Sequence, residues 1–418
     1  MGTLKTNISG HLRNKINVSI KFSDDEIEVG KLILDNRKVY FKYNDKFLER
    51  GLNLSPIKLQ FNNSIQFAKP EPFQGIFGVF DDSLPDGWGK LLLNRALEKE
   101  GLSLNDINIL DQLAYVGETG RGALIYRPAI TNEENFSDDI DIDRLKTVID
   151  KVFKGTSVEI IEELMHLGGS SGGARPKANV GYNPGTDELI HGYNNLPEGF
   201  EHWIIKFPNS EDPFDISNIE YAYHKMALAA NIEMSECKLF ESKEGLQIFG
   251  TKRFDRIGNN RLHMHSMAGL THDNFRRSSI DYGHVIDTAY TLEQSAAARK
   301  KVLRLAAFNV YSHNRDDHSK NFSWLMDDVG NWTFAPAYDL TYSSTAIGEH
   351  STRIAGEGAY PGRKNILALA KEFSISKPNE IIEEVQDAIA EWPKIAKACG
   401  VNEASLDRIQ KKFNQLTD

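Results

Sequence analysis

The sequence has few cysteines, no long apolar run and no signal-like N-terminus. Its two cysteines among 418 residues, Cys237 and Cys399, form no CxxC pair. This usage excludes a disulfide framework and fits a reducing cytoplasm. No apolar stretch approaches the roughly 20 residues that a membrane-spanning helix needs, and the N-terminal residues lack the apolar region of a signal peptide. We expect a cytoplasmic protein that does not contact a membrane.

Positive charge is also in deficit. The chain has 49 Lys and Arg residues against 59 Asp and Glu residues, which gives a formal net charge of -10. A protein that coats nucleic acid over a broad surface needs a basic excess, so this class is disfavoured, although a local basic patch is compatible with the totals. The length predicts two or three domain-sized units, and 40% hydrophobic residues suffice for ordinary cores.

Secondary-structure signals change from β-rich to helical along the chain. Residues 30–70 have β character, and a hairpin turn is expected at Asn44 and Asp45. Helical patterns cover about 86–101 and 104–115, whereas the acidic stretch 129–145 suits an exposed connection. The other elements that we expect are strands at 122–128, 202–208, 237–240 and 246–256, and helices at 156–166, 218–230, 292–313 and 379–398. The aromatic stretch FGVF at 77–80 is assigned to the core.

Three polar side chains within residues 312–340 have the pattern of a phosphoryl-transfer site. Asn321 follows Asp316 by five positions, and Asp339 lies on the next segment. In protein-kinase-type sites, an aspartate accepts the proton of the substrate hydroxyl, and an asparagine and a second aspartate hold magnesium. Asp316 has the required separation from Asn321, so the adjacent Asp317 is assigned a structural role.

The D-x4-N motif alone is weak, and two other interpretations stay open. The segment is also a surface loop rich in Asp, Asn and His. A transition-metal site built from His313, His318 and the aspartates is a further alternative. The asparagine and the distant Asp339 fit a magnesium site with oxygen ligands better.

A glycine-rich stretch, GGSSGGARPKA, occupies residues 168–178. Glycine lacks a Cβ, so the backbone N–H groups of such a turn can approach a phosphate closely. Gly168 and Gly173 have Walker A spacing, but Ala174 and Arg175 follow in place of the lysine motif. A flexible linker is the alternative, against which stand the two cations Arg175 and Lys177.

Lys206 lies in the apolar strand-like segment WIIKF. A lysine at such a place can contact the α- and β-phosphates of a nucleotide when an acidic residue of a nearby helix pairs with it. Glu220, fourteen residues on, is the candidate partner. It has a competing role, because Ser217 and Glu220 also form the S-x-x-E pattern of a helix capping box.

The order and spacing of these segments resemble HipA-type serine/threonine kinases. The segments that carry the resemblance are GGSSGGARPKA, IIKFP, KRFDR, NRDDHSKNF and AYDL, with FDDSLPDGWG nearer the N-terminus. The resemblance spans about residues 20–395, and NRDDHSKNF is its most specific part. It implies an α+β, two-lobed kinase-like fold with a β-containing N-terminal lobe and a mostly helical C-terminal lobe. The expected parts are an N-terminal subdomain at 1–128, an ATP-binding lobe at 145–258 and a helical catalytic lobe at 259–418.

The resemblance also implies roles for individual residues. Asp316 would be the catalytic base, and Asn321 and Asp339 would bind Mg²⁺. The residues expected around ATP are Gly172, Gly173, Ala174, Arg175, Lys177 and Lys206 at the phosphates, Lys252 and Phe254 at the adenine, and Tyr338 and His318. His318 and Lys320 are alternatives for stabilising the transferred phosphate.

Many HipA-type kinases modify a serine in or just before the glycine-rich loop. Ser170 and Ser171 occupy that place here. A phosphate there would add charge and three acceptor oxygens and could eject the loop from the ATP site. The loop departs from the family in Arg175, where glutamine is common, and in the pair Gly172-Gly173.

The resulting hypothesis is an ATP-dependent kinase that phosphorylates serine or threonine in a cellular protein. The family suggests an aminoacyl-tRNA synthetase or another translation factor as target. It also suggests a HipB-like helix-turn-helix antitoxin as partner, through which alone DNA would be contacted. Many members are toxins of such pairs. A small-molecule kinase and a catalytically silent kinase-like scaffold in a repressor complex remain alternatives.

Overall fold

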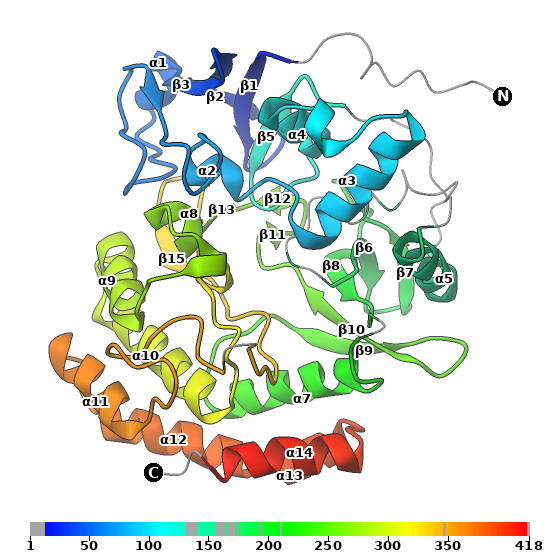
Figure 1. Ribbon diagram of the computed structural model, residues 1–418, viewed down its shortest axis with the longest axis vertical. Coiled ribbons are helices and arrows are strands. Elements are labelled where there is room, and N and C mark those ends of the chain that lie inside the picture. Colours follow the sequence, from blue (N-terminus) through cyan, green and yellow to red (C-terminus); the bar gives the residue numbers. More distant parts are fainter. Residues whose placement is uncertain are drawn as a thin grey trace. The chain divides into compact units, whose positions relative to one another are not determined.

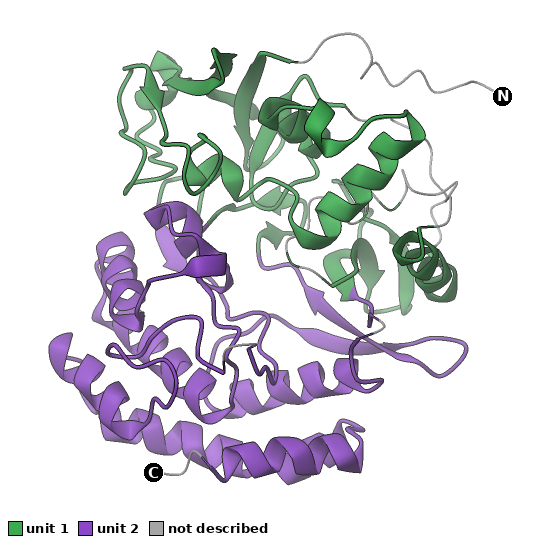
Figure 2. Cartoon of the chain, in the orientation of Figure 1, with its two compact units in different colours: residues 1–205, 255–265, 326–330 green, residues 206–254, 266–325, 331–418 purple. Residues whose placement is uncertain are grey.

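The computed structural model describes residues 13–130, 140–155, 164, 167, 173, 175–192, 194–209, 211–345 and 348–415. The chain forms two compact units (Figure 2). Unit 1 comprises Met1–Ile205, Asp255–His265 and Met326–Gly330, and unit 2 comprises Lys206–Phe254, Ser266–Leu325 and Asn331–Asp418. The three-part division expected from the sequence stays a prediction.

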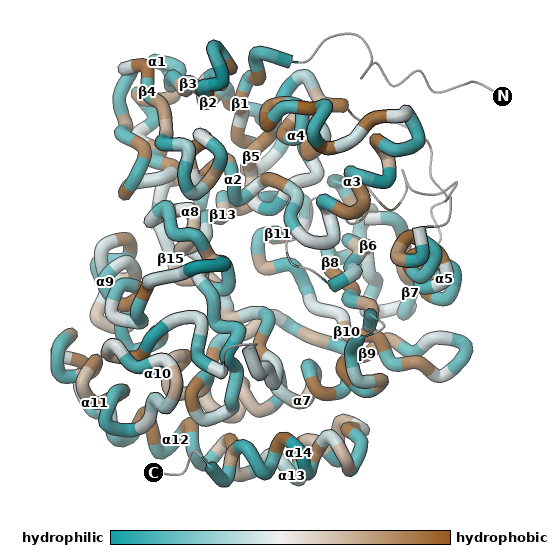
Figure 3. The backbone as a smooth tube through the Cα atoms, in the orientation of Figure 1, coloured by the Kyte–Doolittle hydropathy of each residue, from teal (hydrophilic) through white to brown (hydrophobic). Residues whose placement is uncertain are grey.

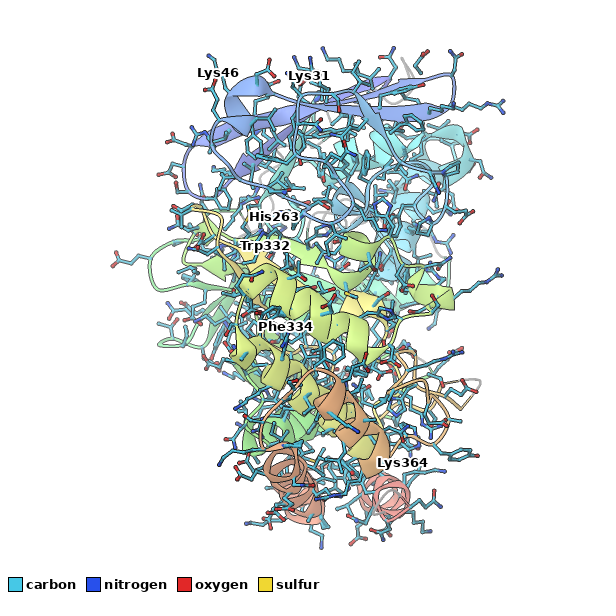
Figure 4. All side chains as sticks on the ribbon, turned by 90° about the vertical axis from the view of Figure 1, so that its left-hand side faces the viewer. Lys31, Lys46, His263, Trp332, Phe334 and Lys364 are labelled. Atoms are coloured by element: carbon cyan, nitrogen blue, oxygen red, sulfur yellow. The ribbon has the colours of Figure 1, made fainter. Side chains whose placement is uncertain are left out.

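Unit 1 begins with an antiparallel five-stranded sheet of order β4-β3-β2-β1-β5 (Figure 1). Its strands are β1 (Lys15–Lys21), β2 (Glu26–Asp35), β3 (Lys38–Tyr43), β4 (Gln66–Phe67) and β5 (Leu124–Arg127). Alternate residues of β1, such as Val18 and Ile20, are fully buried, and Lys31 of β2 is exposed (Figure 4). The sheet therefore has the inward apolar face that a half-buried antiparallel sheet requires.

The expected hairpin turn at Asn44 and Asp45 is wrong. The turn lies between β2 and β3, where Asn36 and Arg37 have φ values of 47° and 64°. Two successive residues with positive φ match the twist of an antiparallel hairpin. Asn44 instead caps helix α1 (Asp45–Leu48), with its side chain accepting a bond from the N–H of Lys46.

The chain forms several helices between strands β4 and β5 of unit 1. They are α2 (Gly78–Asp81), α3 (Gly87–Lys99), the 3₁₀ turn η1 (Leu104–Asp106) and α4 (Ile109–Val116). Helix α3 agrees with its predicted extent, and Gly101 follows it with a φ of 74°. The single helix expected at 104–115 is divided, because Asn108 forms a capping box that starts α4. Phe77, Val79 and Phe80 are buried, as expected for a core stretch.

The remaining elements of unit 1 include a helix and three further strands in the order β7-β6-β8. They are α5 (Ile142–Phe153), β6 (Lys177–Asn183), β7 (Glu188–His191) and β8 (Glu201–Lys206), whose last residue is the first of unit 2. The short strands β11 (Arg256–Ile257), β12 (Asn260–Arg261) and β13 (His263–Ser266) follow later in the chain. The helix expected at 156–166 lies outside the described residues but for Leu164, and the connection expected at 129–145 is shortened because Asp141 caps α5.

Unit 2 is mostly helical. Its helices are α7 (Ile216–Ala229), α8 (Met267–Thr271), α9 (Tyr282–Glu293), α10 (Ala296–Tyr311), α11 (Arg363–Glu372), α12 (Pro378–Ala390), α13 (Trp392–Ala398) and α14 (Glu403–Phe413). It also holds the 3₁₀ turns η2 (Phe275–Arg277) and η3 (Ser319–Asn321) and the strands β9 (Cys237–Glu241), β10 (Gln247–Lys252), β14 (Ser323–Met326) and β15 (Trp332–Phe334). Helix α13 packs on α7 and α14 (Figure 1), with Trp392 edge-on to Tyr223 at 5.5 Å between ring centroids.

Two predicted helices of unit 2 are divided. The helix expected at 379–398 ends at Ala390 and restarts at Trp392. Pro393 stands in the first turn of α13, where a missing N–H is tolerated, and it would break a continuous helix. The helix expected from Leu292 is split because Gln294 adopts a left-handed conformation after α9 and Ser295 caps α10.

Hydrophilic and hydrophobic residues alternate along α12 and α14 (Figure 3), as expected for helices with one buried stripe. The exposed Lys364 of α11 lies on the polar side of such a helix (Figure 4). Among the described residues, no helix combines the length and the apolar character needed to cross a membrane. Cys237 and Cys399 are both free thiols.

Candidate active site

Lys206, at the end of β8, is held between two carboxylates of unit 2. Its ammonium group forms ion pairs with Glu220 of α7 and with Asp339. The Lys206 side chain is 11% exposed, and its Nζ lies 5.4 Å from the centre of the Phe249 ring. The expected pair of Lys206 with Glu220 is therefore present.

The competing capping box is not formed. Helix α7 begins at Ile216, one residue before Ser217, so Ser217 lies inside the helix and is buried. Glu220 is 5% exposed and faces Lys206, because the helix turns it toward the end of β8. The sequence alone could not separate the two roles, since the capping box needs a helix that starts at 218, two residues later than Ile216.

The two carboxylates control the charge of Lys206. Burial alone would lower the pKa of its ammonium group, but the negative charges of Asp339 and Glu220 outweigh burial and raise the pKa above its ordinary value. The side chain therefore stays a cation at neutral pH. A charged lysine paired with a glutamate is the arrangement that contacts nucleotide phosphates in protein-kinase-type sites.

Asp339 adopts an unusual backbone conformation. Its φ is 53°, in the left-handed region that Asp and Asn tolerate better than other residues with a Cβ. The side chain is 38% exposed while it pairs with Lys206. The carboxylate is thus accessible to a ligand as well as to the lysine.

Asp316 and Asn321 lie at opposite ends of one short loop. The side-chain N–H of Asn321 donates to the backbone carbonyl of Asp316 at 2.8 Å. This bond closes the loop, which contains η3, and brings the two side chains to the same region. Asp316 is exposed, and the side-chain oxygen of Asn321 accepts no hydrogen bond from the described part of the chain. An exposed carboxylate and an available amide oxygen are the arrangement that the spacing predicts.

The neighbouring Asp317 points into the core of unit 2. It is 1% exposed and accepts bonds from the hydroxyl of Tyr282 and Nδ1 of His350, each at 3.0 Å. The N–H of Ser351 donates to its other oxygen at 2.9 Å. Burial and the charge of Asp317 together raise the pKa of Tyr282 well above its usual range. Asp317 therefore has the structural position that we expected.

The two histidines of this region are not brought together as a metal site. The His313 ring stacks on Tyr342 with 5.3 Å between centroids, and burial lowers its pKa to about 4. His318 lies edge-on to Phe275 at 5.2 Å. Among the described residues, no group of three or more His, Cys, Asp and Glu side chains is arranged to hold a metal ion.

Aromatic residues lie next to the segment that precedes Asp339. The Phe254 and Tyr338 rings are 5.3 Å apart, and the hydroxyl of Tyr338 donates to the carbonyl of Lys320 at 2.6 Å. The backbone N–H of Lys252 donates to Glu236 at 2.9 Å. That N–H is therefore engaged, so a backbone contact of this segment with an adenine would use other groups.

The described part of the glycine-rich stretch belongs to unit 1. Gly173, Arg175 and Lys177 are described, whereas Ser170, Ser171, Gly172 and Ala174 lie outside the described residues. The φ of Gly173 is 94°, and a Cβ at this position would come within 2.7 Å of Nζ of Lys177. The positive φ therefore favours glycine here, whereas the flexible Lys177 side chain could move away from a Cβ.

Two residues at the start of α3 hold this glycine. The N–H of Gly173 donates to the carboxylate of Asp86 at 2.6 Å, and its carbonyl accepts from the N–H of Trp88 at 3.0 Å. The indole N–H of Trp88 donates to the carbonyl of Lys177 at 3.1 Å. We did not assign Asp86 and Trp88 to the site from the sequence, although both lie in the DGWG segment that carried the resemblance.

The donor groups of unit 2 fit a magnesium ion. Mg²⁺ takes oxygen ligands and is held in nucleotide sites by one or two carboxylates with the phosphates and water. Asp339 supplies an accessible carboxylate, and Asn321 supplies an amide oxygen without a protein donor among the described residues. These two groups are hard oxygen donors, whereas a zinc or iron site would use nitrogen or sulfur ligands.

The fold and this constellation define a protein of the kinase-like α+β class expected from the sequence. The family model of the HipA-like C-terminal domain matches residues 169–392, and that of the HipA N-terminal domain matches residues 22–127. The chain belongs to the HipA-like family. The resemblance and the fold class expected from the sequence are thereby confirmed.

One solved structure shares the fold over nearly the whole chain. HipA of Shewanella oneidensis MR-1, from a toxin–antitoxin complex of HipA, HipB and operator DNA, matches with a TM-score of 0.68 and 17% identity over 95% of each chain. The Helicobacter pylori proinflammatory kinase CtkA is similar over 51% of this chain and 87% of its own, with 15% identity, but its TM-score of 0.35 is too low to support an argument. No curated protein sequence matched the chain.

Proposed function

We propose that this chain is an ATP-dependent kinase that transfers the γ-phosphoryl group to a serine or threonine of a cellular protein. The observation that carries the proposal is Lys206 between Glu220 and Asp339, in the same unit as the loop of Asp316 and Asn321. A lysine–glutamate pair, a metal-binding aspartate and a base with an asparagine are the parts that protein-kinase chemistry uses. Membership of the HipA-like family supports the same activity.

Each residue has a distinct task in the proposed reaction. Asp316 accepts the proton of the substrate hydroxyl as its oxygen bonds to the γ-phosphorus and the bond to the leaving ADP breaks. Lys206 contacts the nucleotide phosphates, and its ion pair with Glu220 orients its ammonium group. Asn321 and Asp339 would hold Mg²⁺, which would supply positive charge against the phosphates.

The glycine-rich stretch is proposed to bind phosphates of ATP. Gly172, Gly173, Ala174, Arg175 and Lys177 are proposed to contact phosphates, and Asp86 fixes Gly173 for this purpose. Lys252, Phe254 and Tyr338 are proposed around the adenine, with His318 or Lys320 near the transferred phosphate. Autophosphorylation at Ser170 or Ser171 is proposed as the means of regulation.

Partners and compartment are proposed from the family. A HipB-like helix-turn-helix protein is the proposed antitoxin partner, since the similar HipA was solved with HipB and operator DNA. DNA contact would then occur through that partner, which agrees with a net charge of -10 on this chain. The free thiols of Cys237 and Cys399 suit a cytoplasmic protein. An aminoacyl-tRNA synthetase is a proposed target.

Incubation of the purified protein with [γ-³²P]ATP, magnesium and a cell lysate tests the activity, with Asp316→Ala as the control. Labelled protein bands that need Asp316 would support the proposal, and phosphoamino-acid analysis would identify serine or threonine. Labelled metabolites without labelled proteins would instead favour a small-molecule kinase. Identical patterns for the wild type and Asp316→Ala would favour a catalytically silent scaffold.

The partner proposal has its own test. A small helix-turn-helix protein encoded beside this gene would be co-expressed with the tagged chain and purified. Co-elution in a stoichiometric complex supports the pairing, and binding of the complex to the promoter DNA supports indirect DNA contact. Independent elution of the two proteins contradicts it.

A further inference from the structure

A turn in unit 2 carries two arginines beside the loop of Asp316 and Asn321. We call residues 274–278 the basic turn; it contains η2 and follows α8. The hydroxyl of Ser319 donates to the carboxylate of Asp273 at 2.5 Å, and the N–H of Met267 donates to the carbonyl of Phe322 at 2.8 Å. These bonds attach the segment before the basic turn to both ends of η3.

Phe275 forms the contact between the basic turn and the loop itself. Its ring lies 5.2 Å from the ring of His318, and Nζ of Lys320 is 4.8 Å from its centre. The guanidinium carbon of Arg276 is 4.5 Å from the same centre. Each exposed cation–π contact is worth about 0.5–1 kcal/mol. Arg276 is thus held next to the residues that follow Asp316, instead of extending freely into solvent.

The charge of the basic turn is not neutralised locally. Arg276 and Arg277 are both exposed, and neither forms an ion pair with a carboxylate among the described residues. The nearby Asp273 already accepts the Ser319 hydroxyl. On a chain with a net charge of -10, two adjacent unpaired arginines reverse the prevailing sign. Such a reversal attracts an anionic group of a partner.

We propose that the basic turn selects protein substrates with an acidic segment next to the phosphorylated residue; this rests on the proposed kinase activity. A substrate hydroxyl at Asp316 would place the neighbouring residues of its chain along the loop, toward Phe275 and the arginines. Asp or Glu side chains there pair with Arg276 and Arg277, whose forked guanidinium groups bind carboxylates through two parallel bonds. The two arginines therefore determine specificity and take no part in the chemistry.

An acidic peptide segment fits this surface better than a nucleic acid. A protein that binds nucleic acid uses several cations along a stripe, and the affinity rises with the number of phosphates contacted. The basic turn offers two exposed arginines. Its neighbour on the loop, Asp316, is an exposed carboxylate that would repel a phosphate backbone.

The proposal is tested by determining the amino-acid sequence around each phosphorylated residue. Wild-type protein and the variant Arg276→Glu/Arg277→Glu are incubated with ATP, magnesium and a lysate whose own kinases have been inactivated, and phosphosites are mapped. Sites that depend on Asp316 should be enriched in Asp and Glu near the phosphorylated residue for the wild type. The variant should phosphorylate those sites roughly tenfold less, because each exposed ion pair is worth up to about 1 kcal/mol, and should prefer sites flanked by Lys and Arg.

Two further variants separate charge from folding. Arg276→Lys/Arg277→Lys keeps the charge and should retain most of the acidic preference. Lys397→Glu/Lys411→Glu makes the same charge change on exposed residues of α13 and α14 and should leave site selection unchanged. Hydrolysis of ATP without added protein should be equal in all four proteins, which shows that the ATP site is intact.

The outcomes are distinguishable. Wild-type sites without an acidic excess, or an unchanged excess after Arg276→Glu/Arg277→Glu, would overturn the proposed specificity while the kinase activity stands. A wild type that labels nothing beyond Asp316→Ala would overturn the kinase activity, and the specificity with it. Binding of a labelled RNA oligonucleotide that is lost only in the charge-reversed variant would assign the basic turn to nucleic acid instead.

Discussion

The hydroxyl of Tyr282 donates a hydrogen bond to the buried carboxylate of Asp317 at 3.0 Å. Asn309 in turn donates to the Tyr282 hydroxyl at 2.8 Å, and the hydroxyl of Thr352 donates to the Asp317 carbonyl at 2.5 Å. The segment around Thr352 is therefore joined to helices α9 and α10 through Asp317 and Tyr282. Asp316, the next residue in the chain, is exposed.

This difference predicts opposite effects of two adjacent substitutions. Asp317→Ala removes the acceptor of several buried donors and should lower the free energy of unfolding by about 3 kcal/mol. Asp316→Ala changes an exposed residue, so stability should stay within about 0.5 kcal/mol of the wild type while phosphorylation is lost. Denaturant unfolding and a phosphorylation assay measure both. Equal stability losses in the two variants would contradict the assignment.

Asp339→Asn should weaken magnesium dependence without unfolding the site. Asn tolerates the left-handed conformation of Asp339 and keeps one oxygen, but it loses the charge that attracts the metal. We expect the magnesium concentration for half-maximal activity to rise at least about tenfold, by analogy with the loss of one strong charge interaction. Asp339→Ala, which is also strained at this φ, should show an additional loss of stability. An unchanged magnesium profile for Asp339→Asn would remove Asp339 from the metal site.

Asp86→Ala should impair ATP binding, although Asp86 takes no part in the proposed phosphoryl transfer. Without the carboxylate, the N–H of Gly173 loses its acceptor, and the glycine-rich stretch keeps only its bonds to Trp88 at the start of α3. The KM for ATP should rise about three- to tenfold, with a smaller change in kcat, because the loop binds phosphates in the ground state as well. Glu98→Ala on the same helix removes only exposed contacts and serves as the control. A raised KM in both variants would indicate a general effect on α3.

Buried His263 should make the protein sensitive to acid (Figure 4). Burial, together with the neighbouring His265, lowers its pKa to about 3. An unfolded histidine binds a proton near pH 6.5, so between about pH 6.5 and 3 the unfolded state holds the extra proton. The free energy of unfolding should therefore fall as pH falls, by roughly 2 kcal/mol for this residue between pH 7 and 5. Calorimetry of His263→Gln should show that Tm changes less with pH than in the wild type. An equally strong pH dependence in the variant would show that other residues cause the acid sensitivity.

Local patterns predicted the parts of the site that lie close together in the sequence. Asp316 and Asn321 are five residues apart, and one hydrogen bond within the loop holds them close in space. The apolar context of Lys206 predicted a strand at 202–208, and β8 covers Glu201–Lys206. These features depend on neighbours in the chain, so a sequence contains enough information for them.

The features that the sequence did not predict depend on distant residues or on the exact start of an element. Asp86 and Gly173 are 87 positions apart, and no periodicity connects them. Asn44 and Asn36 are both turn-forming residues, and the pairing of β2 with β3 determines which one forms the hairpin. Likewise, the sequence left two roles open for Glu220, a pair with Lys206 and a capping box, and the start of α7 at Ile216 excludes the capping box.

The net charge of Lys206, Glu220 and Asp339 bears on whether free ATP or its magnesium complex binds. Two carboxylates against one ammonium leave a formal surplus of one negative charge when all three are ionised. A metal-free ATP anion would be repelled by this negative charge. One divalent cation would change the net charge of the group from negative to positive. The protein is thus expected to discriminate between free ATP and its magnesium complex by charge, before any contact with the adenine or ribose is made.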